Sequence, residues 1–266
     1  MPTVQTVEAD RSTVHYSTVG EGPGLVFVAG TGLDGQTNFG HLVDAFTGER
    51  TVVLPDYAGS GATEGPEGEL TVEILAGQIA AVVREVTAAG GPVDLVGYSL
   101  GAVVAAAVAA SHPEAIRRLV LVAGWDAPDA RHELNIDVWR KLELADHDLF
   151  NRFLQIAVFS PEFLSALGSE TLQGLIQNAP PISEGMRRHI DLDARADIRD
   201  LLPKITAPTL VIGLTHDYVV PVGAVRRLHE AIAGSEYAEI PSGHAVVFER
   251  PQELVEAVRQ FLFKTS

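Results

Sequence analysis

A serine flanked by two glycines is the pattern in this chain best suited to covalent chemistry. Gly97-Tyr98-Ser99-Leu100-Gly101 has the form G-x-S-x-G, follows the apolar run Val93–Val96 and opens an alanine- and valine-rich helical stretch. In a strand–turn–helix setting such a pattern forms a tight turn that presents the serine hydroxyl beside a helix N-terminus, whose free N–H groups stabilise negative charge. Ser99 is therefore the candidate nucleophile, and the alternative is a glycine-rich turn with an incidental serine.

A serine hydroxyl needs a base that accepts its proton. Of the nine histidines, His244 is the candidate, because it lies in Pro241-Ser242-Gly243-His244, a turn-rich loop between the last predicted strand and the last predicted helix. Loops that follow the carboxyl ends of strands are where α/β sheets place their chemistry. For each of the other histidines we expect a surface or structural role.

An acidic side chain should orient that base from another such loop. Asp217 follows the apolar run Thr209–Ile212, and it would hold one imidazole nitrogen so that the other faces Ser99. Asp126 follows a neighbouring predicted strand and is the rival for this role. We expect Asp126 instead to cap the first helix of the segment that it precedes.

Acyl transfer also needs two backbone N–H donors for the oxyanion that develops. We expect one from Leu100, the residue after the candidate nucleophile. The second should come from the glycine-rich loop Ala29–Gly35 after the first central strand, with Thr31 as first choice and Gly32 as second. The alternative for this loop is a plain flexible turn.

Short β-rich runs alternate with helical patterns along most of the chain. The runs are nearly all continuously apolar, which predicts strands covered on both faces in a mostly parallel sheet with helices on both sides. Thr3–Glu8 and Thr13–Val19 alternate instead and predict an added antiparallel edge. The six runs are Leu25–Val28, Thr51–Leu54, Val93–Val96, Leu119–Val122, Thr209–Ile212 and Glu236–Ile240, and the helices are expected near Asn38–Phe46, Thr71–Ala89, Leu100–Ser111, Ala224–Ala233 and Gln252–Phe261.

Residues 126–204 break this rhythm, because they carry helical patches rich in large apolar side chains and no strand signal. A structureless loop of that length is implausible in a compact domain. We therefore expect a helical insertion that acts as a lid, dividing the chain into a core, 1–125 and 205–266, and a cap, 126–204. The substrate pocket is expected to be lined by Gly32, Leu33, Tyr98, Trp125, Trp139, Phe153 and Phe159.

Several further motifs stand in a fixed order along the chain. Asp56-Tyr57-Ala58-Gly59-Ser60-Gly61-Ala62-Thr63 has the form D-x-x-G-x-G-x-[S/T], Asp217 to Pro221 reads D-x-x-x-P, and Gly243-His244 is followed by Phe248-Glu249-Arg250-Pro251. With the G-x-S-x-G pattern, they make the chain resemble the α/β-hydrolase fold superfamily, closest to its esterase, lactonase and C–C hydrolase branch with a helical cap. The resemblance implies that fold and a triad in the order Ser99, Asp217, His244. Members commonly have His-Gly where this chain has Ala29-Gly30, so we expect a rearranged oxyanion loop.

Composition narrows the possible partners. The chain has 266 residues, a formal net charge of −16 and no basic stripe, which disfavours nucleic acid and anionic membranes. It has no cysteine, which excludes disulfides, thiolate metal sites and cysteine catalysis. No metal constellation or nucleotide fingerprint is apparent, so no cofactor is expected.

The N-terminus lacks the apolar run of a signal peptide, and the longest apolar stretch is far below the about 20 residues that cross a bilayer. We expect a cytoplasmic monomer or homodimer.

These observations favour hydrolysis of a carboxylic ester, thioester or lactone of a mostly hydrophobic small molecule through an acyl–serine intermediate. The apolar composition of the insertion predicts a substrate from secondary metabolism. The same fold could instead serve C–C bond hydrolysis, cofactor-free lyase chemistry or cyclisation, since exclusion of water decides among such outcomes. A third interpretation is a ligand-binding protein without catalysis, because fold alone does not determine function.

Overall fold

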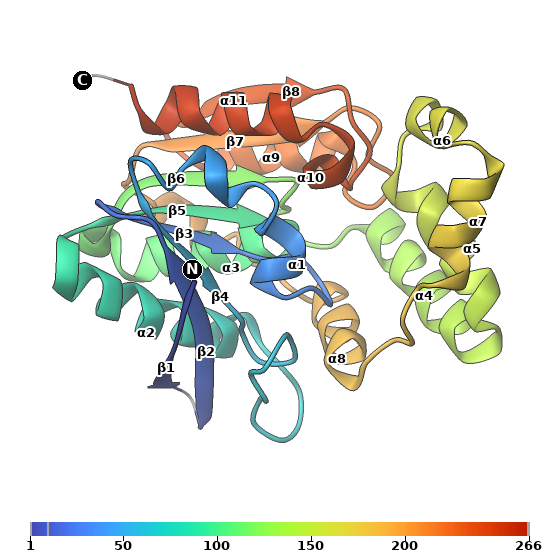
Figure 1. Ribbon diagram of the computed structural model, residues 1–266, viewed down its shortest axis with the longest axis horizontal. Coiled ribbons are helices and arrows are strands. Elements are labelled where there is room, and N and C mark those ends of the chain that lie inside the picture. Colours follow the sequence, from blue (N-terminus) through green and yellow to red (C-terminus); the bar gives the residue numbers. More distant parts are fainter. Residues whose placement is uncertain (1, 10, 265–266) are drawn as a thin grey trace.

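An eight-stranded sheet forms the centre of the protein in the computed structural model, which describes residues 2–9 and 11–264 (Figure 1). Its strand order is β1-β2-β4-β3-β5-β6-β7-β8. Strands β3 to β8 run parallel to one another, whereas β2 is antiparallel to both β1 and β4. The strands are β1 (Thr3–Ala9), β2 (Ser12–Val19), β3 (Gly24–Val28), β4 (Thr51–Pro55), β5 (Val93–Tyr98), β6 (Ile116–Val122), β7 (Thr209–Leu214) and β8 (Glu236–Ile240). The predicted parallel sheet with an antiparallel edge is confirmed.

Burial along the strands explains their apolar sequences. Every residue of β3, β5 and β7 is buried, because helices cover both faces of the sheet at these strands. Strand β8 lies at the edge of the sheet and carries two exposed glutamates, Glu236 and Glu239. Exposed charges of this kind discourage a further strand from pairing at an edge.

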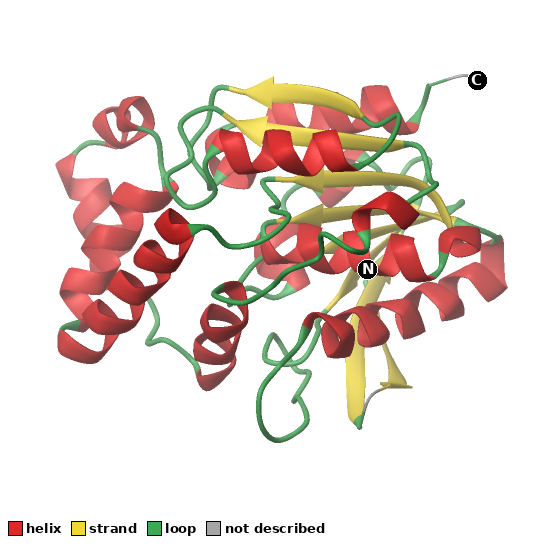
Figure 2. Cartoon of the chain, turned by 180° about the vertical axis from the view of Figure 1, so that it is seen from behind, coloured by secondary structure: helices red, strands yellow, loops and turns green. Residues whose placement is uncertain are grey.

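The helices form two layers on the sheet (Figures 1 and 2). One apolar core lies between the sheet and helices α2, α3 and α9, and a second lies between its other face and α1, α10 and α11. Helix α3 is buried on all sides from Leu100 to Ala109, where small residues let it sit close to the sheet. These helices are α1 (Gly35–Phe39), α2 (Val72–Gly90), α3 (Leu100–Ser111), α9 (Val222–Ala231), α10 (Val246–Glu249) and α11 (Pro251–Leu262), with short 3₁₀ turns at Val43–Ala45, Pro113–Ala115 and Leu202–Lys204.

One helix prediction was wrong in its bounds. The segment expected as a single helix near Asn38–Phe46 overlaps only the last two residues of α1, which ends at Phe39, and contains the separate 3₁₀ turn. Helix α1 begins earlier than expected because the Asp34 side chain accepts hydrogen bonds from the N–H and the hydroxyl of Thr37.

The segment between β6 and β7 is helical, as expected. Its helices gather at one end of the sheet (Figure 1), and α8 lies beside the loop after β4, where the Arg188 guanidinium donates to the carbonyls of Pro66 and Gly68. Asp129, not Asp126, caps its first helix by accepting from two backbone N–H groups. The helices are α4 (Ala130–Ala145), α5 (His147–Val158), α6 (Pro161–Leu167), α7 (Ser169–Gln177) and α8 (Glu184–Asp193). In the part of the chain that the structure describes, no helix is long and apolar enough to span a bilayer.

Candidate active site

Ser99 occupies the sharp turn between β5 and α3. Its backbone lies at φ 57° and ψ −124°, a conformation that costs free energy in a residue with a side chain and that recurs at functional sites. A Cβ atom on Gly97 would come within 2.2 Å of the Gly101 carbonyl oxygen, and one on Gly101 within 2.1 Å of the Val28 carbonyl oxygen. Both glycines are therefore required by the close approach of helix and sheet at this turn.

The three residues predicted to act together form a series in which His244 is within hydrogen-bonding distance of both Ser99 and Asp217. His244 Nε2 is 3.0 Å from Ser99 Oγ, and His244 Nδ1 is 2.7 Å from Asp217 Oδ2. The other carboxylate oxygen of Asp217 accepts from the N–H groups of Val219 and Val220 at 2.7 and 2.8 Å. All three side chains are buried. This arrangement fixes the carboxylate, orients the imidazole and leaves one of its nitrogens facing the hydroxyl.

The loop that carries His244 is held from two sides. The Tyr98 hydroxyl donates to the His244 carbonyl oxygen at 2.7 Å, and burial raises the pKa of Tyr98 well above its ordinary value, so the phenol stays a donor. The buried Glu249 carboxylate accepts from the Gly243 N–H at 3.1 Å, and from the Ser160 N–H and hydroxyl at 3.0 and 2.6 Å. Glu249 thereby ties this loop to the start of α6.

The loop after β3 uses most of its N–H groups on specific acceptors. The Gly30 N–H donates to Asn38 Oδ1 at 2.9 Å, that of Gly32 to His189 Nδ1 at 3.1 Å, and that of Leu33 to the Gly30 carbonyl oxygen at 3.3 Å. Among the described residues, by contrast, the N–H groups of Thr31 and Leu100 donate to no acceptor. Gly32, the second choice as oxyanion donor, has its N–H engaged elsewhere.

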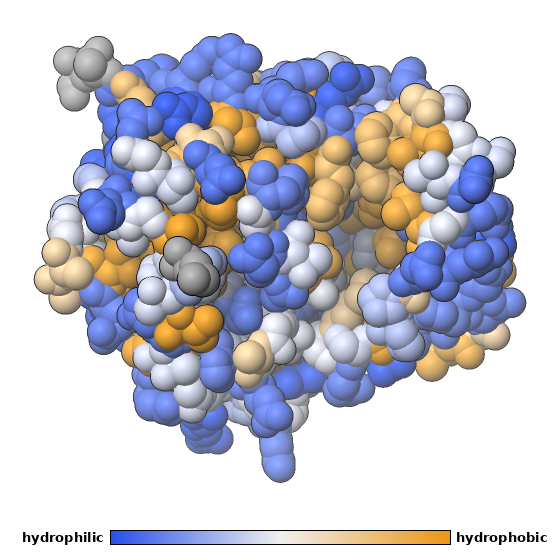
Figure 3. Space-filling view, in the orientation of Figure 1, coloured by the Kyte–Doolittle hydropathy of each residue, from blue (hydrophilic) through white to orange (hydrophobic). Residues whose placement is uncertain are grey.

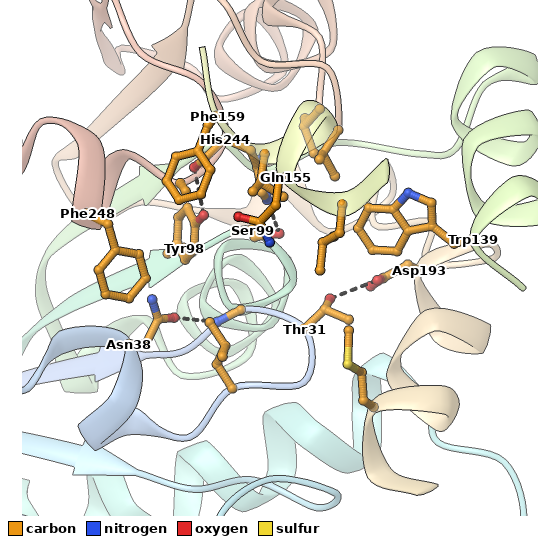
Figure 4. A pocket seen from close by; sticks show the side chains of 18 of the residues that line it. Thr31, Asn38, Tyr98, Ser99, Trp139, Gln155, Phe159, Asp193, His244 and Phe248 are labelled. Carbon is orange, nitrogen blue, oxygen red and sulfur yellow. Dashed lines mark hydrogen bonds between the residues drawn. The ribbon is translucent and has the colours of Figure 1, made fainter. Parts of the chain in front are cut away.

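A mainly apolar cavity of about 550 Å³ opens above Ser99 (Figures 3 and 4). Of the residues expected to line it, Leu33, Tyr98, Trp125, Trp139 and Phe159 do so, together with Thr31, Ser99 and His244. The apolar character comes from side chains of both the strand ends and the insertion. Additional apolar lining residues are Ile136, Leu154, Val158, Phe163, Leu167, Leu175, Met186, Val219, Val220, Ala245 and Phe248.

Two residues expected in the pocket do not line it. Gly32 lies beneath Met186, whose Cγ would be 2.6 Å from a Cβ at this position, so that side chain stands between Gly32 and the cavity. Phe153 faces the opposite side of α5 and lines a separate surface groove with Leu134 and Tyr218. Large apolar residues occur on both sides of α5, and only one side meets the cavity.

Sequence reasoning missed the polar groups of the cavity, which include His132, Gln155 and Asp193. Gln155 and Asp193 are seen in Figure 4. Asp193 accepts from the Thr31 hydroxyl at 2.8 Å, and burial raises its pKa from the ordinary 3.8 to about 7. His132 Nε2 is 3.0 Å from the Asp193 carbonyl oxygen, and burial lowers the pKa of His132. The available signal was the four-residue spacing of His189 and Asp193, which puts both on one side of a helix.

Comparison with known proteins identifies the family to which this fold and these loops belong. The sequence pattern of the alpha/beta hydrolase family matches residues 25–257. The chain belongs to the alpha/beta hydrolase family. This alpha/beta hydrolase is 38% identical over 259 residues to a pyrrolizixenacetamide deacetylase of Xenorhabdus hominickii, covering 96% of this chain and 97% of the relative. It is 27% identical over 261 residues to a pimeloyl-(acyl-carrier protein) methyl ester esterase of Xanthomonas oryzae pv. oryzae, covering 94% and 98%.

A solved structure has the same fold. The crystal structure of MGS-M2, an alpha/beta hydrolase enzyme from a Medee basin deep-sea metagenome library, superposes with a TM-score of 0.89 over 99% of this chain and 98% of that one, at 21% identity. Identity this low supports similarity of fold alone. Within the described part of this hydrolase, no group of three or more histidine, aspartate or glutamate side chains is arranged to hold a metal ion.

Proposed function

We propose that this alpha/beta hydrolase is a serine hydrolase that cleaves an acyl group from a mostly hydrophobic small molecule through an acyl–serine intermediate. The observation that carries the proposal is the hydrogen-bonded series from Asp217 through His244 to Ser99, which ends on a hydroxyl facing an apolar cavity. A nucleophile, a base and a group that orients the base are the parts that acyl transfer requires.

In acylation, Ser99 Oγ attacks the substrate carbonyl carbon while His244 Nε2 accepts the hydroxyl proton. Asp217, 2.7 Å from Nδ1, stabilises the imidazolium that forms. The carbonyl oxygen becomes an oxyanion, which accepts from the N–H groups of Thr31 and Leu100. The bond from the carbonyl carbon to the leaving group then breaks, and His244 returns its proton to that group.

In deacylation, a water molecule takes the place of the leaving group. His244 accepts a proton from this water, whose oxygen attacks the acyl carbon of the ester formed on Ser99. The same two N–H groups stabilise the second oxyanion. The bond from the acyl carbon to Ser99 Oγ breaks, Oγ regains a proton from His244, and the acid is released.

The cavity and the relatives support a substrate class. An apolar lining favours an apolar molecule, and Gln155 and Thr171 supply isolated polar groups that could orient it. One relative is named as a deacetylase and another as a methyl ester esterase. We propose carboxylic esters, thioesters and lactones as substrates, and the deacetylase name adds N-acetyl compounds to those that should be tested.

We also propose that residues 126–204 form a lid over the core formed by 1–125 and 205–266. Helices α4 to α8 lie within this insertion, and it contributes side chains to the cavity wall opposite Ser99, including Trp139, Gln155 and Phe159. Closure by such a wall excludes water that would otherwise compete with the substrate for the polar groups of the site.

The test combines labelling with turnover. The wild type is treated with a fluorophosphonate, and the labelled residue is located by mass spectrometry. Turnover is then measured on p-nitrophenyl acetate, butyrate and octanoate, a thioester, a lactone and an N-acetyl arylamine. Ser99→Ala is expected to abolish labelling and to lower kcat by about 10⁴-fold or more. Ser111→Ala, at the exposed far end of the same helix, is the matched control.

A wild-type rate in Ser99→Ala would refute the proposal. Absence of labelling and turnover in folded protein would favour the ligand-binding interpretation. Reaction in H₂¹⁸O separates hydrolysis from lyase and cyclase chemistry, because hydrolysis places one ¹⁸O atom in the released acid.

A further inference from the structure

Two side chains of helix α8, one turn apart, reach across to the loop after β3. His189 Nδ1 accepts from the Gly32 N–H at 3.1 Å, and Asp193 Oδ2 accepts from the Thr31 hydroxyl at 2.8 Å (Figure 4). Both side chains are buried, with relative exposures of 0% for His189 and 4% for Asp193. The insertion therefore contacts the candidate oxyanion loop through two hydrogen bonds from buried side chains of α8.

The start of the same helix packs so closely against this region that two glycines there leave no room for a Cβ atom. A Cβ on Gly185 would lie 1.9 Å from the Gly59 carbonyl oxygen, and a Cβ on Gly32 would lie 2.6 Å from Met186 Cγ. Gly59 and Gly32 have φ values of +90° and +71°, which favour glycine as well. Contacts this close leave helix α8 little freedom to shift relative to the two loops beneath it.

The hydrogen bonds of His189 define its protonation. Nδ1 accepts from the Gly32 N–H, so it carries no proton, and Nε2 carries the proton that it donates to the Ala58 carbonyl oxygen at 2.7 Å. Burial lowers the pKa of His189 from the ordinary 6.5 to about 4, which keeps the ring neutral. The imidazole thus links the oxyanion loop to the loop after β4 with one acceptor and one donor.

The direction of the Thr31 N–H follows from that of the Gly30 carbonyl, which belongs to the same peptide group. The Gly30 carbonyl oxygen accepts from the Tyr57 hydroxyl at 3.2 Å and from the Leu33 N–H at 3.3 Å. In a planar trans peptide the N–H points opposite to the carbonyl, so the Thr31 N–H faces away from Tyr57 and Leu33. The Thr31 side chain is fixed by Asp193 and the next N–H by His189, which leaves this N–H as the free donor on a loop that lines the cavity.

We propose that helix α8 positions the second oxyanion donor, with His189 and Asp193 as the positioning residues. The inference rests on the proposed acyl transfer, because an oxyanion must form for the donor to matter. A misplacement of about 1 Å at such a site lowers the rate by about 100-fold. Neither residue needs to touch the substrate for this effect.

Two substitutions of His189 test its two hydrogen bonds one at a time, because each variant keeps one bond and loses the other. In His189→Asn the amide oxygen takes the position of Nδ1 and can still accept from Gly32, whereas the link to Ala58 is lost. In His189→Gln the amide nitrogen takes the position of Nε2 and can still donate to Ala58, whereas the link to Gly32 is lost. His229→Gln, whose histidine lies on α9 and is hydrogen-bonded to Ser235, is the matched control.

On p-nitrophenyl acetate, we expect His189→Gln to lower kcat by about 10- to 100-fold with KM little changed, because the oxyanion contact forms in the transition state. His189→Asn should keep kcat within about 3-fold of the wild type, and His229→Gln should leave it unchanged. The rate of labelling by a fluorophosphonate should follow the same order. Circular dichroism melting confirms that each variant is folded.

Equal kcat values for the folded Gln and Asn variants would overturn the inference, whether both are high or both are low. Should His189→Gln not fold, the hydroxyl contact gives the second test, in which Thr31→Val lowers kcat and Thr31→Ser restores it. Thr31→Val with the kcat of Thr31→Ser would also overturn the inference. A wild type that neither labels nor turns over would instead refute the proposed function.

Discussion

Asp193 and His189 should act in opposite directions on the pH dependence of stability. Burial raises the pKa of Asp193 from 3.8 to about 7, so between these pH values the folded protein keeps a proton that the unfolded chain has lost. Stability attributable to Asp193 therefore falls as pH rises through this range. Burial lowers the pKa of His189 from 6.5 to about 4, so the unfolded chain binds a proton below pH 6.5 that the folded protein does not. Stability attributable to His189 falls as pH falls.

The magnitudes follow from the same pKa values. At about 1.4 kcal/mol per pH unit, the range from 3.8 to about 7 corresponds to about 4 kcal/mol for Asp193. The range from 6.5 to about 4 corresponds to about 3 kcal/mol for His189. The two contributions nearly cancel between pH 4 and pH 6.5 in the wild type. A variant that lacks one of these two ionisations should therefore show the pH dependence of stability that the other produces.

Asp193→Asn is the sharpest perturbation, because it removes the ionisation and keeps a carbonyl acceptor for the Thr31 hydroxyl. The free energy of unfolding of this variant minus that of the wild type should be about 3 kcal/mol larger at pH 8 than at pH 5, since about two pH units of the Asp193 range lie between them. The variant therefore gains stability relative to the wild type as pH rises. Urea unfolding followed by fluorescence of the two tryptophans, both buried at the cavity, measures this difference.

Asp200→Asn is the matched control, because it makes the same chemical change at an exposed aspartate. Its effect should be constant over the same pH range. A constant difference between Asp193→Asn and the wild type from pH 5 to pH 8, or an equal pH-dependent change in the control, would refute the reasoning.

Three further substitutions test the site. Asp217→Asn should lower kcat by about 10⁴-fold without unfolding the protein, because it favours the wrong imidazole tautomer, and kinetics with a melting curve check this. Gly32→Ala should destabilise the protein by about 1–3 kcal/mol, because its Cβ would lie 2.6 Å from Met186 and its φ is +71°. Gly48→Ala is the control and should not destabilise the protein, because a Cβ there has nothing within 4 Å. Equal melting temperatures of the two variants would contradict the contact with Met186. Glu249→Gln should cost about 1–3 kcal/mol in urea unfolding, because this buried carboxylate accepts three hydrogen bonds, and an unchanged unfolding midpoint would argue against that role.

The centre of the sheet was predictable because its strands are short, buried on both faces and therefore continuously apolar. Val93–Val96, for example, was predicted, and the strand in the structure runs from Val93 to Tyr98. The bounds of the insertion helices were harder to predict. Asp126 and Asp129 are both suitable caps by residue type, and only the path of the chain decides that Asp129 accepts the N–H groups of α4. Short-range propensity cannot distinguish two acceptors three residues apart.

The site residues also fall into those that the sequence predicts and those that it does not. Ser99, Asp217 and His244 are found by their place after strands, because parallel strands bring their carboxyl ends to one edge. Phe153 and Phe159 could not be distinguished by pattern, since both are large apolar residues at helical spacing in or beside α5, and only tertiary packing makes Phe159 part of the cavity. Asp193 was missed because a polar residue near a helix end is usually solvated.

The oxyanion loop shows most clearly what a sequence leaves out. The family resemblance implies a histidine where this chain has Ala29, and that departure predicted only that the loop would be rearranged. In the structure the loop is held by side chains from elsewhere: Asn38 nearby, Tyr57 after β4, and His189 and Asp193 about 160 positions along the chain. Apart from the four-residue spacing that puts His189 and Asp193 on one side of α8, a contact over that separation leaves no signal in the sequence. It makes part of the candidate catalytic geometry depend on the insertion, so the insertion both shapes the cavity and supports the loop on which the proposed oxyanion donor lies.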